Sequence, residues 1–372
     1  MPMKSLLTLT FLVILISSCE QKTARFPASD EDFWNITPER DINVVHPSTQ
    51  SEEVVRLRDA KIVIVDYDLV RRDFPTIQHL PNHEIDEWLL ENLAYVSKPQ
   101  ANQHRVNTPI KITDKTREAL RPPKYGRALV FDMNDPVSGS SLGLMDVKGS
   151  GSLRPSQADH GNGVATLGES IREFLYENLM RRVLKDNGQD FKTVGSYAVI
   201  DAGFEVLHAD GSTSPAGLYV RQAHVRPYSG SEWLPDPKRT QLQAKLRTYG
   251  IDPNENIQGT LDHRGIYDFG HYVVKDDLPL IDIKKQVPFN MWGYDKNIKI
   301  PSTVYDSRWF YSKQDHPWFW SHELADSWRK GTANRDDVWN HFVNMLSPVE
   351  QKLQTGIGGQ GTCRQLLEKI IH

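Results

Sequence analysis

Short apolar stretches rich in β-branched residues recur along the chain and predict strands. Lys61–Asp66 reads KIVIVD, and Arg127–Phe131 reads RALVF. A third stretch runs from Leu142 to Lys148, after a segment of Gly, Ser, Pro and Asp that is typical of a hairpin. Two further strands are predicted in GSYAVIDAG and GLYVRQAHV, at residues 195–203 and 217–225.

Apolar residues at helical spacing predict helices next to these strands. The segment HEIDEWLLENLAYV, residues 83–96, has one apolar face, and Asn82 is placed to cap its N-terminus. A second helix is marked by one face that carries Ile171, Phe174, Leu175, Leu179 and Val183. A third is predicted in RTQLQAKLRTYG, residues 239–250. Strands therefore flank a single helix in the middle of the chain, and the expected fold class is α+β.

The composition is that of a soluble, globular protein. Of the 372 residues, 25% are charged and 38% are hydrophobic, which allows one large domain or two moderate ones. The net charge of −4 gives no overall basic field, so nucleic acid is not expected as a partner.

Residues 1–19 differ in composition from the rest. Lys4 precedes an uncharged apolar run, Leu6–Ile16, which is too short to span a bilayer but is organised like a secretory signal. The small residues before Cys19 resemble a bacterial lipobox, which implies cleavage before Cys19 and lipid attachment there. The alternatives are a buried N-terminal helix and a simple signal peptide with an incidental cysteine.

A lipid anchor at Cys19 implies a lipoprotein of the bacterial cell envelope, held at the outer membrane or facing the periplasm. Residues 20–55 are polar and aperiodic, so we expect a flexible tether between the anchor and the folded body. Cys363 is the only other cysteine. Lipidation of Cys19 would therefore leave no intrachain disulfide.

The C-terminal third carries an aromatic cluster at residues 306–328, DSRWFYSKQDHPWFWSHELADSW. We interpret it as a helical core with several tryptophans rather than as a ligand groove. Its HELAD sequence has Asp326 where a zinc protease motif needs a second histidine, which excludes that kind of zinc site.

The strongest candidate chemistry lies between Lys148 and Glu173. Lys148 ends a predicted strand, a Gly- and Ser-rich segment follows, and Glu173 lies in the first turns of the next helix. This is the arrangement by which kinase-like folds hold a lysine against nucleotide phosphates, with the carboxylate orienting the ammonium. Glu173 lies between Ile171 and Phe174, beside the apolar face.

The spacing leaves another interpretation open. Glu169, Glu173 and Glu177 fall four residues apart, so they could form an exposed acidic stripe with Arg181 as a partner.

The same segment resembles the selenoprotein O family of pseudokinase-fold protein adenylyltransferases. In that family a lysine strand runs into KGAG, then a GDGRAVL turn, then SIREF. This chain has KGSG at 148–151, GNGVATL at 161–167 and SIREF at 170–174. The resemblance implies that Lys148 and Glu173 form an ion pair at the phosphates of ATP, and that Asn162 and Gly163 contact the nucleotide.

Two flanking segments extend the resemblance. YGRALVF at 125–131 is similar to the family's GDGRALLL, which implies nucleotide contacts for Gly126 and Arg127, although a lysine and a tyrosine replace the preceding glycine and aspartate. GLYVRQAHVRP at 217–227 is similar to the family's RVAxSHxR, which makes Arg221 and Arg226 the candidate phosphate-binding arginines.

Two segments farther along the chain carry the metal-binding and catalytic residues that the resemblance implies. NENI at 254–257 and DFG at 268–270 are similar to the family's NTDNM and DYG. Asn256 and Asp268 are thereby implied ligands of Mg²⁺ (or Mn²⁺) beside ATP. Glu255 stands where the family has its catalytic aspartate, the base for the acceptor hydroxyl. Its extra methylene moves the carboxylate by about an ångström, which can cost on the order of 100-fold in rate.

The resemblance covers residues 125–270 and implies a protein-kinase-like, two-lobed fold. Residues 56–228 would form an N-lobe-like part with a small antiparallel sheet and one key helix, and residues 229–372 a reduced, mostly helical C-lobe-like part. The implied activity is transfer of AMP from ATP to a Ser, Thr or Tyr hydroxyl of an acceptor protein. The alternatives are a phosphotransferase on the same fold and a pseudokinase-like binding module without turnover. Glu255 and the scarcity of ATP in the cell envelope favour the binding module.

Overall fold

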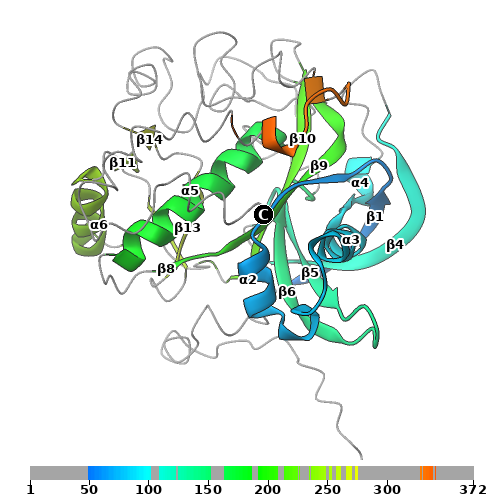
Figure 1. Ribbon diagram of the computed structural model, residues 1–372, viewed down its shortest axis with the longest axis horizontal. Coiled ribbons are helices and arrows are strands. Elements are labelled where there is room, and N and C mark those ends of the chain that lie inside the picture. Colours follow the sequence, from blue (N-terminus) through cyan, green and yellow to red (C-terminus); the bar gives the residue numbers. More distant parts are fainter. Residues whose placement is uncertain are drawn as a thin grey trace, which may run out of the picture.

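The structure is α+β, with a large antiparallel sheet and helices packed on it (Figure 1). The computed structural model describes residues 49–101, 109–122, 125–151, 163–186, 192–207, 213–224, 226, 234, 236–248, 251–253, 257–260, 265–269, 273–274, 327–328, 330–337 and 340. The α+β class expected from the sequence is confirmed for this part of the chain.

In the described part of the chain the sheet has nine strands, in the order β2-β9-β10-β6-β5-β4-β1-β3, with β7 paired to β10. All of its pairings are antiparallel. The strands are β1 (Gln50–Leu57), β2 (Lys61–Val65), β3 (Tyr95–Ser97), β4 (Ile112–Arg121), β5 (Ala128–Asn134), β6 (Ser141–Lys148), β7 (Ala165–Thr166), β9 (Ser196–Leu207) and β10 (Thr213–Gln222).

The five strands predicted from apolar runs correspond to β2, β5, β6, β9 and β10. The sheet is larger than the small one expected, because β1, β3, β4 and β7 had not been foreseen. β4 carries mostly exposed or half-exposed polar residues, so no apolar alternation marks it. β1 starts at Gln50, inside the segment expected to be a tether, and buries Val54 and Val55.

Helices lie on both faces of the sheet. The helices that contact its strands are α2 (Tyr67–Asp73), α3 (Asn82–Leu93), the short α4 (Lys98–Ala101) and α5 (Leu167–Asp186), with a 3-10 turn, η1, at Pro75–Ile77. Helix α6 (Asp236–Thr248) instead lies beside the short strand at Ile251–Asp252 (Figure 1). The predicted N-cap role of Asn82 is wrong, because Pro81 occupies the cap position of α3. The Asn82 side chain instead accepts a hydrogen bond from Arg71 at 2.7 Å.

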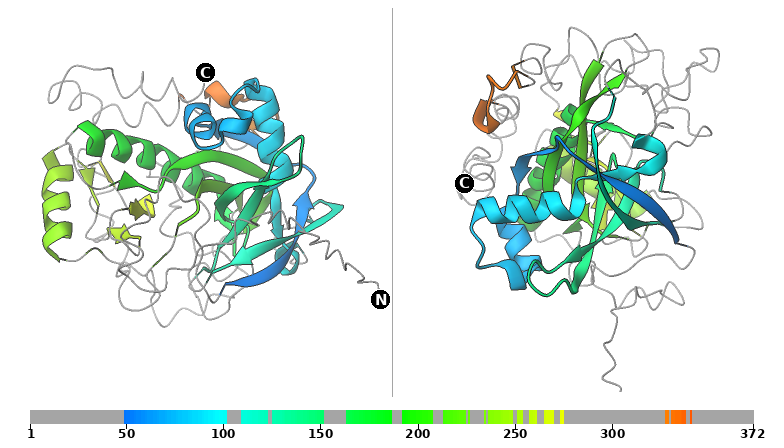
Figure 2. Two further views of the ribbon diagram at one scale, coloured as in Figure 1. Left: turned by 90° about the horizontal axis from the view of Figure 1, so that it is seen from below. Right: turned by 90° about the vertical axis from the view of Figure 1, so that its right-hand side faces the viewer.

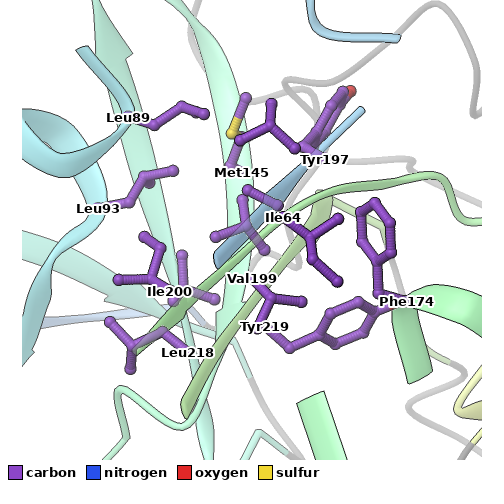
Figure 3. Packing of buried hydrophobic residues seen from close by; sticks show 14 of the residues in the cluster. Ile64, Leu89, Leu93, Met145, Phe174, Tyr197, Val199, Ile200, Leu218 and Tyr219 are labelled. Atoms are coloured by element: carbon purple, nitrogen blue, oxygen red, sulfur yellow. The ribbon is translucent and has the colours of Figure 1, made fainter. Parts of the chain in front are cut away.

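The strand register decides which side chains face α5. Arg221 lies directly across from Asp146, and Tyr219 across from Lys148. Because side chains alternate between the faces of a strand, these four groups share one face, and Met145 and Val147 point to the other. Figure 3 shows Leu89 and Leu93 of α3 and Phe174 of α5 approaching the strands from opposite sides. Buried apolar residues of α3, α5 and the strands between them belong to one core cluster.

The chain that follows α5 forms two small sheets in addition to its strands in the large sheet (Figure 2). One pairs β11 (Ile251–Asp252) with β14 (Val273–Val274), and the other joins β12 (Gln258–Gly259), β13 (Gly265–Tyr267) and β8 (Lys192–Thr193). β13 runs parallel to β8, which follows α5 and leads into β9. That pairing brings Asp268, the residue after β13, close to the N-terminal turns of α5 and to the end of β6.

A short piece of the C-terminal third also packs on the large sheet. The indole of Trp328 donates to Asp201 at 2.5 Å, and the guanidinium of Arg335 donates to the Val63 carbonyl at 2.9 Å. Trp328 is buried in the main core. Of the aromatic cluster at 306–328, only Ser327 and Trp328 lie within the described residues.

Candidate functional site

Lys148, the last residue of β6, points at two carboxylates of α5. Its ammonium makes a short contact with Glu173 and lies 3.0 Å from Glu169. All three side chains are buried. The ion pair predicted between Lys148 and Glu173 is therefore present, and a second carboxylate that had no predicted role at the site joins it.

The alternative of an exposed acidic stripe on α5 is wrong as to exposure. Glu169, Glu173 and Glu177 are all buried. Glu177 does pair with Arg181, at 3.1 Å, but Arg181 also binds Asp66 at 2.7 Å. Asp66, Glu177 and Arg181 thus form a polar network separate from the one at Lys148.

Arg127 enters the same cluster from the loop before β5. Its Nη1 donates to one oxygen of Glu169 at 2.9 Å, and its Nη2 lies 2.8 Å from the other oxygen, so the two side chains form a close ion pair. The neighbouring Gly126 lies against the loop that follows Lys148. Glu169 thus joins Arg127 to Lys148.

The loop after Lys148 is tightly fixed by main-chain hydrogen bonds. The N–H groups of Gly149 and Gly151 both donate to the Arg127 carbonyl, at 2.8 and 2.9 Å. Ser97 of β3 donates its N–H to the Ser150 carbonyl at 2.8 Å. The backbone therefore sets the position of Lys148 before any ligand contributes.

We expect Gly151→Ala to lower the free energy of unfolding by about 3 kcal/mol, because overpacking here meets main-chain atoms. A Cβ atom at position 151 would lie 2.3 Å from the Gly126 oxygen and 2.9 Å from the Arg127 Cα. Urea denaturation measures the change. Gly195→Ala is the matched control, since its Cβ would meet only the end of the Leu69 side chain, at 3.0 Å. Equal effects of the two substitutions would contradict the close approach of these loops.

Arg221 of β10 joins the large sheet to Asp268. Its Nε donates to Asp146 at 2.9 Å, and its Nη1 donates to Asp268 at 3.1 Å. Arg221 and Asp146 are both fully buried. Asp146 was not among the predicted site residues, and it fixes the guanidinium from the adjacent strand.

Asp268 completes the cluster from the end of β13. Its Oδ1 lies 3.6 Å from the Lys148 ammonium, and its side chain is 18% exposed. Burial raises the pKa of Asp268, but the positive charges of Lys148, Arg221 and Arg226 outweigh this and hold the pKa well below its usual range. The carboxylate is therefore ionised at neutral pH.

The backbone at Asp268 is also unusual. Its φ is +61°, a left-handed value that no other non-glycine residue adopts in the described part of the chain. Such a conformation costs on the order of 1 kcal/mol and is typically kept where a side chain must point in a set direction.

Glu173 has the opposite electrostatic shift. Burial raises the pKa of Glu173, the nearby carboxylates of Asp268 and Glu169 add to the rise, and the Lys148 ammonium lowers it only in part. One oxygen of Glu173 is buried without a hydrogen-bond partner. The Lys148 ammonium is thus the charge that most favours the ionised form of Glu173.

Arg226, the second candidate arginine, lies apart from these ion pairs. Its guanidinium carbon is 4.6 Å from the Tyr125 ring centre and 4.8 Å from that of Tyr267. His224 lies beside the same two rings, with its ring centre 4.6 Å from that of Tyr267. Burial, helped by the charge of Arg221, lowers the pKa of His224 to about 3, so this histidine is neutral.

Together these groups form what we call the charge cluster, in which the described residues supply four cations and four carboxylates. Its cations are Arg127, Lys148, Arg221 and Arg226, and its carboxylates are Asp146, Glu169, Glu173 and Asp268. An anionic ligand therefore has to compete with carboxylates that are already in place.

Several predicted residues have no described position. Cys19, Asn162, Glu255 and Asn256 lie outside the described residues. Gly163 is described, with φ +77°, immediately upstream of β7 and α5. The structure thus brings together Arg127, Lys148, Glu173, Arg221 and Asp268, with Gly126 in the adjoining loop and Arg226 at the edge.

Sequence reasoning missed Asp146, Glu169, Tyr125 and Tyr267. The only available signal for Asp146 was its position two residues before Lys148, which places both on one face of a strand. Glu169 was one helical turn from Glu173, on the same side of α5. Nothing in the sequence linked the two tyrosines to Arg226.

Of the two predicted metal ligands, Asp268 lies within the described residues and Asn256 does not. The described residues contain no group of three or more His, Cys, Asp or Glu side chains that could hold a metal ion. Asp268 is ionised and partly exposed, so it can offer an oxygen. Magnesium in phosphate-binding sites is commonly held by one or two carboxylates, substrate oxygens and water, and Asp268 fits that pattern.

Within the described parts of the chain, no helix combines the length and apolar character needed to cross a bilayer.

Comparison with known proteins gives this chain no family. No protein-family model matches it, and no curated protein has a matching sequence.

Proposed function

We propose that this protein binds ATP with a divalent cation and transfers AMP to a hydroxyl group of another protein. The observation that carries the proposal is the buried contact between Lys148 and Glu173, with Asp268 at 3.6 Å from the same ammonium. These groups come from β6, α5 and the end of β13, so they meet only through the fold. A lysine, an orienting carboxylate and a metal-binding aspartate are the elements of a triphosphate site.

The charges and their burial support a polyanionic ligand. Lys148 and Arg221 are buried cations, each in contact with the partly exposed Asp268. A cation bound at Asp268 would neutralise that carboxylate and leave both positive charges available to phosphate oxygens. Arginine offers a planar fork of donors that matches such oxygens.

Mg²⁺ at Asp268 would supply charge neutralisation for the phosphate oxygens when bound. The residues of the chain would do the positioning. Glu173 orients the ammonium of Lys148, Asp146 fixes Arg221, and the loop from Lys148 to Gly151 is held by its main-chain hydrogen bonds. In phosphoryl chemistry, positioning and charge stabilisation account for most of the rate enhancement.

The transfer of AMP rather than phosphate rests on the resemblance to the selenoprotein O family. The same resemblance supports a protein-kinase-like arrangement of two lobes and a protein acceptor. The lipobox-like residues before Cys19 support a lipid anchor there, in the bacterial cell envelope. Glu255 is the proposed base and Asn256 the proposed second metal ligand, and both lie outside the described residues.

A second candidate is a binding module of the same fold that does not transfer any group. The charge cluster favours it, since each carboxylate already has a cationic neighbour. Under this alternative the cluster would serve stability and ligand recognition only.

Labelled ATP distinguishes the candidates. The purified protein is incubated with ATP labelled at the α- or the γ-phosphate, together with Mg²⁺ or Mn²⁺. We expect label from the α-phosphate to become attached to protein. Label from the γ-phosphate alone would replace AMP transfer by phosphorylation. Nucleotide binding without either label would support the module, and no binding at all would refute a nucleotide site.

A further inference from the structure

Glu177 of α5 is a buried carboxylate that takes no part in the proposed nucleotide contacts. Both of its oxygens accept hydrogen bonds from the segment that leads from β8 into β9. The Thr193 hydroxyl donates to one oxygen at 2.5 Å, and the Ser196 N–H donates to the other at 3.1 Å. Arg181 adds an ion pair at 3.1 Å. Glu177 therefore holds the end of β8 and the start of β9 against α5.

The surroundings of Glu177 favour its ionised form. Burial raises the pKa of this carboxyl, whereas the charge of Arg181 and the hydrogen bonds from Thr193 and Ser196 lower it. A carboxylate accepts hydrogen bonds about twice as strong as those between neutral groups. The link from α5 to β8 is thus stronger than an ordinary contact between a helix and a strand.

β8 in turn holds β13. The two strands are paired in parallel, with Ile266 opposite Thr193, and Val194 donates its N–H to the Ile266 carbonyl at 2.9 Å. β8 packs on α5 (Figure 1), and Asp268 follows directly after β13. The position of the Asp268 carboxylate relative to α5 therefore depends on the anchoring of β8.

The same helix holds the lysine that Asp268 approaches. Glu173 lies four residues before Glu177, so the two carboxylates lie on one side of α5. Glu173 contacts the Lys148 ammonium, and Asp268 lies 3.6 Å from that ammonium. One turn of helix thus separates the carboxylate that orients the lysine from the carboxylate that anchors the strand before Asp268.

We propose that Glu177 is a positioning residue for Asp268. Through the Thr193 hydroxyl it holds β8, and through β8 it holds β13 where Asp268 meets Lys148. The consequence for cation binding rests on the proposed function, in which Asp268 would hold the divalent cation. The link from α5 to β13 does not depend on that function. Loosening the link should raise the cation requirement and leave the contact between Lys148 and Glu173 in place.

Hydrogen exchange measures the link without any ligand. Thr193→Val removes the hydroxyl and keeps the shape of the side chain, whereas Thr193→Ser keeps the hydroxyl. Mass spectrometry of the full chain should show exchange on the order of 10-fold faster in residues 192–196 and 265–268 of Thr193→Val, with β5 and β6 unchanged. Thr193→Ser should exchange like the unaltered chain.

ATP titrations at a series of Mg²⁺ concentrations measure the consequence at the site. Thr193→Val should need on the order of 10-fold more Mg²⁺ for half-maximal ATP binding, because a displaced Asp268 would hold the cation less well. Thr193→Ser should need little more than the unaltered chain. Tyr197→Phe is the matched control, since it also removes a buried hydroxyl that donates to a carboxylate, that of Asp73 at 2.8 Å. It should leave the Mg²⁺ requirement unchanged.

The outcomes separate this inference from the proposed function. Equal exchange of residues 265–268 in Thr193→Val and the unaltered chain would refute the link, as would faster exchange throughout the large sheet. Faster local exchange with an unchanged Mg²⁺ requirement would refute the positioning role. Local exchange as expected, without ATP binding by the unaltered chain, would keep the link and remove the nucleotide site. Should Thr193→Val fail to fold, Thr193→Ser against Thr193→Ala decides, since these two differ only in the hydroxyl.

Discussion

Asp268→Asn is expected to abolish the transfer of label from ATP and to remove the metal-dependent part of nucleotide binding. The amide keeps the size of the side chain but loses the negative charge that would attract a divalent cation. Loss of at least about 100-fold in labelling is expected, because charge stabilisation is a dominant contribution to phosphoryl chemistry. Labelling with α-phosphate-labelled ATP, and titration of ATP with and without Mg²⁺, measure the two effects.

The same substitution has an effect of opposite sign in EDTA. The Asp268 carboxylate lies 3.1 Å from Arg221 and 3.6 Å from Lys148, so removing its charge leaves these cations more positive toward an anion. Pyrophosphate should then bind more tightly to Asp268→Asn than to the unaltered chain. General damage to the fold would weaken binding in both conditions. Asp114→Asn, at an exposed position of β4, is the matched control and should change neither. Unchanged labelling by Asp268→Asn would remove the metal assignment.

Lys148→Met is expected to destabilise the folded protein by about 3–5 kcal/mol, because it leaves the buried Glu173 carboxylate without its cation. The Glu173 side chain is only 1% exposed, so water cannot replace the ammonium. Methionine fills a similar volume, which keeps the loss of packing small. Urea denaturation at neutral pH measures the difference, and label transfer should be lost as well.

The destabilisation should depend on pH in a definite direction. The pKa of Glu173 is already raised above its ordinary value of 4.5 by burial, and loss of the ammonium raises it further. A carboxyl whose pKa is raised by folding stabilises the protein below its unfolded pKa. That contribution is lost as the pH rises through the folded pKa. The deficit of Lys148→Met should therefore be smaller near about pH 5 than near about pH 8.

Two comparisons separate this effect from ordinary loss of an ion pair. Lys115→Met removes a surface partner of Glu91, with both side chains about half exposed, and should cost at most about 1 kcal/mol. Adding Glu173→Gln to Lys148→Met should recover part of the lost stability, since the uncompensated charge is gone. A deficit in Lys148→Met no larger than that in Lys115→Met would refute the buried ion pair.

Much of the sheet and the central helix was predictable from local pattern. β5, β6, β9 and β10 bury apolar residues in runs that a short window detects, and α5 presents its apolar face at helical spacing. β1 and β4 were not foreseen, because partly exposed strands carry polar residues whose pairing depends on a distant partner. The N-terminus of α3 was misjudged because an asparagine that looked like a cap is instead hydrogen-bonded by Arg71.

The spacing between Lys148 and Glu173 left two interpretations open, and tertiary contacts decided between them. A row of glutamates four residues apart reads the same whether it faces water or a buried lysine. Because α5 packs on β10 and β9, Glu169 and Glu173 lie beside Lys148, the last residue of β6. The cost of burying these charges is offset by cations from separate segments, and no local pattern contains that information.

By itself the sequence determined the apolar strands and the central helix, the position of the lysine at the end of its strand and the order of the charged residues along the chain. Strand register alone decided that Asp146 holds Arg221, and the pairing of β13 with β8 decided that Asp268 reaches Lys148. The physical reason is distance along the chain. Hydrophobic period and turn chemistry act over a few residues, whereas the electrostatics of the charge cluster arise between groups that only folding brings within a few ångströms.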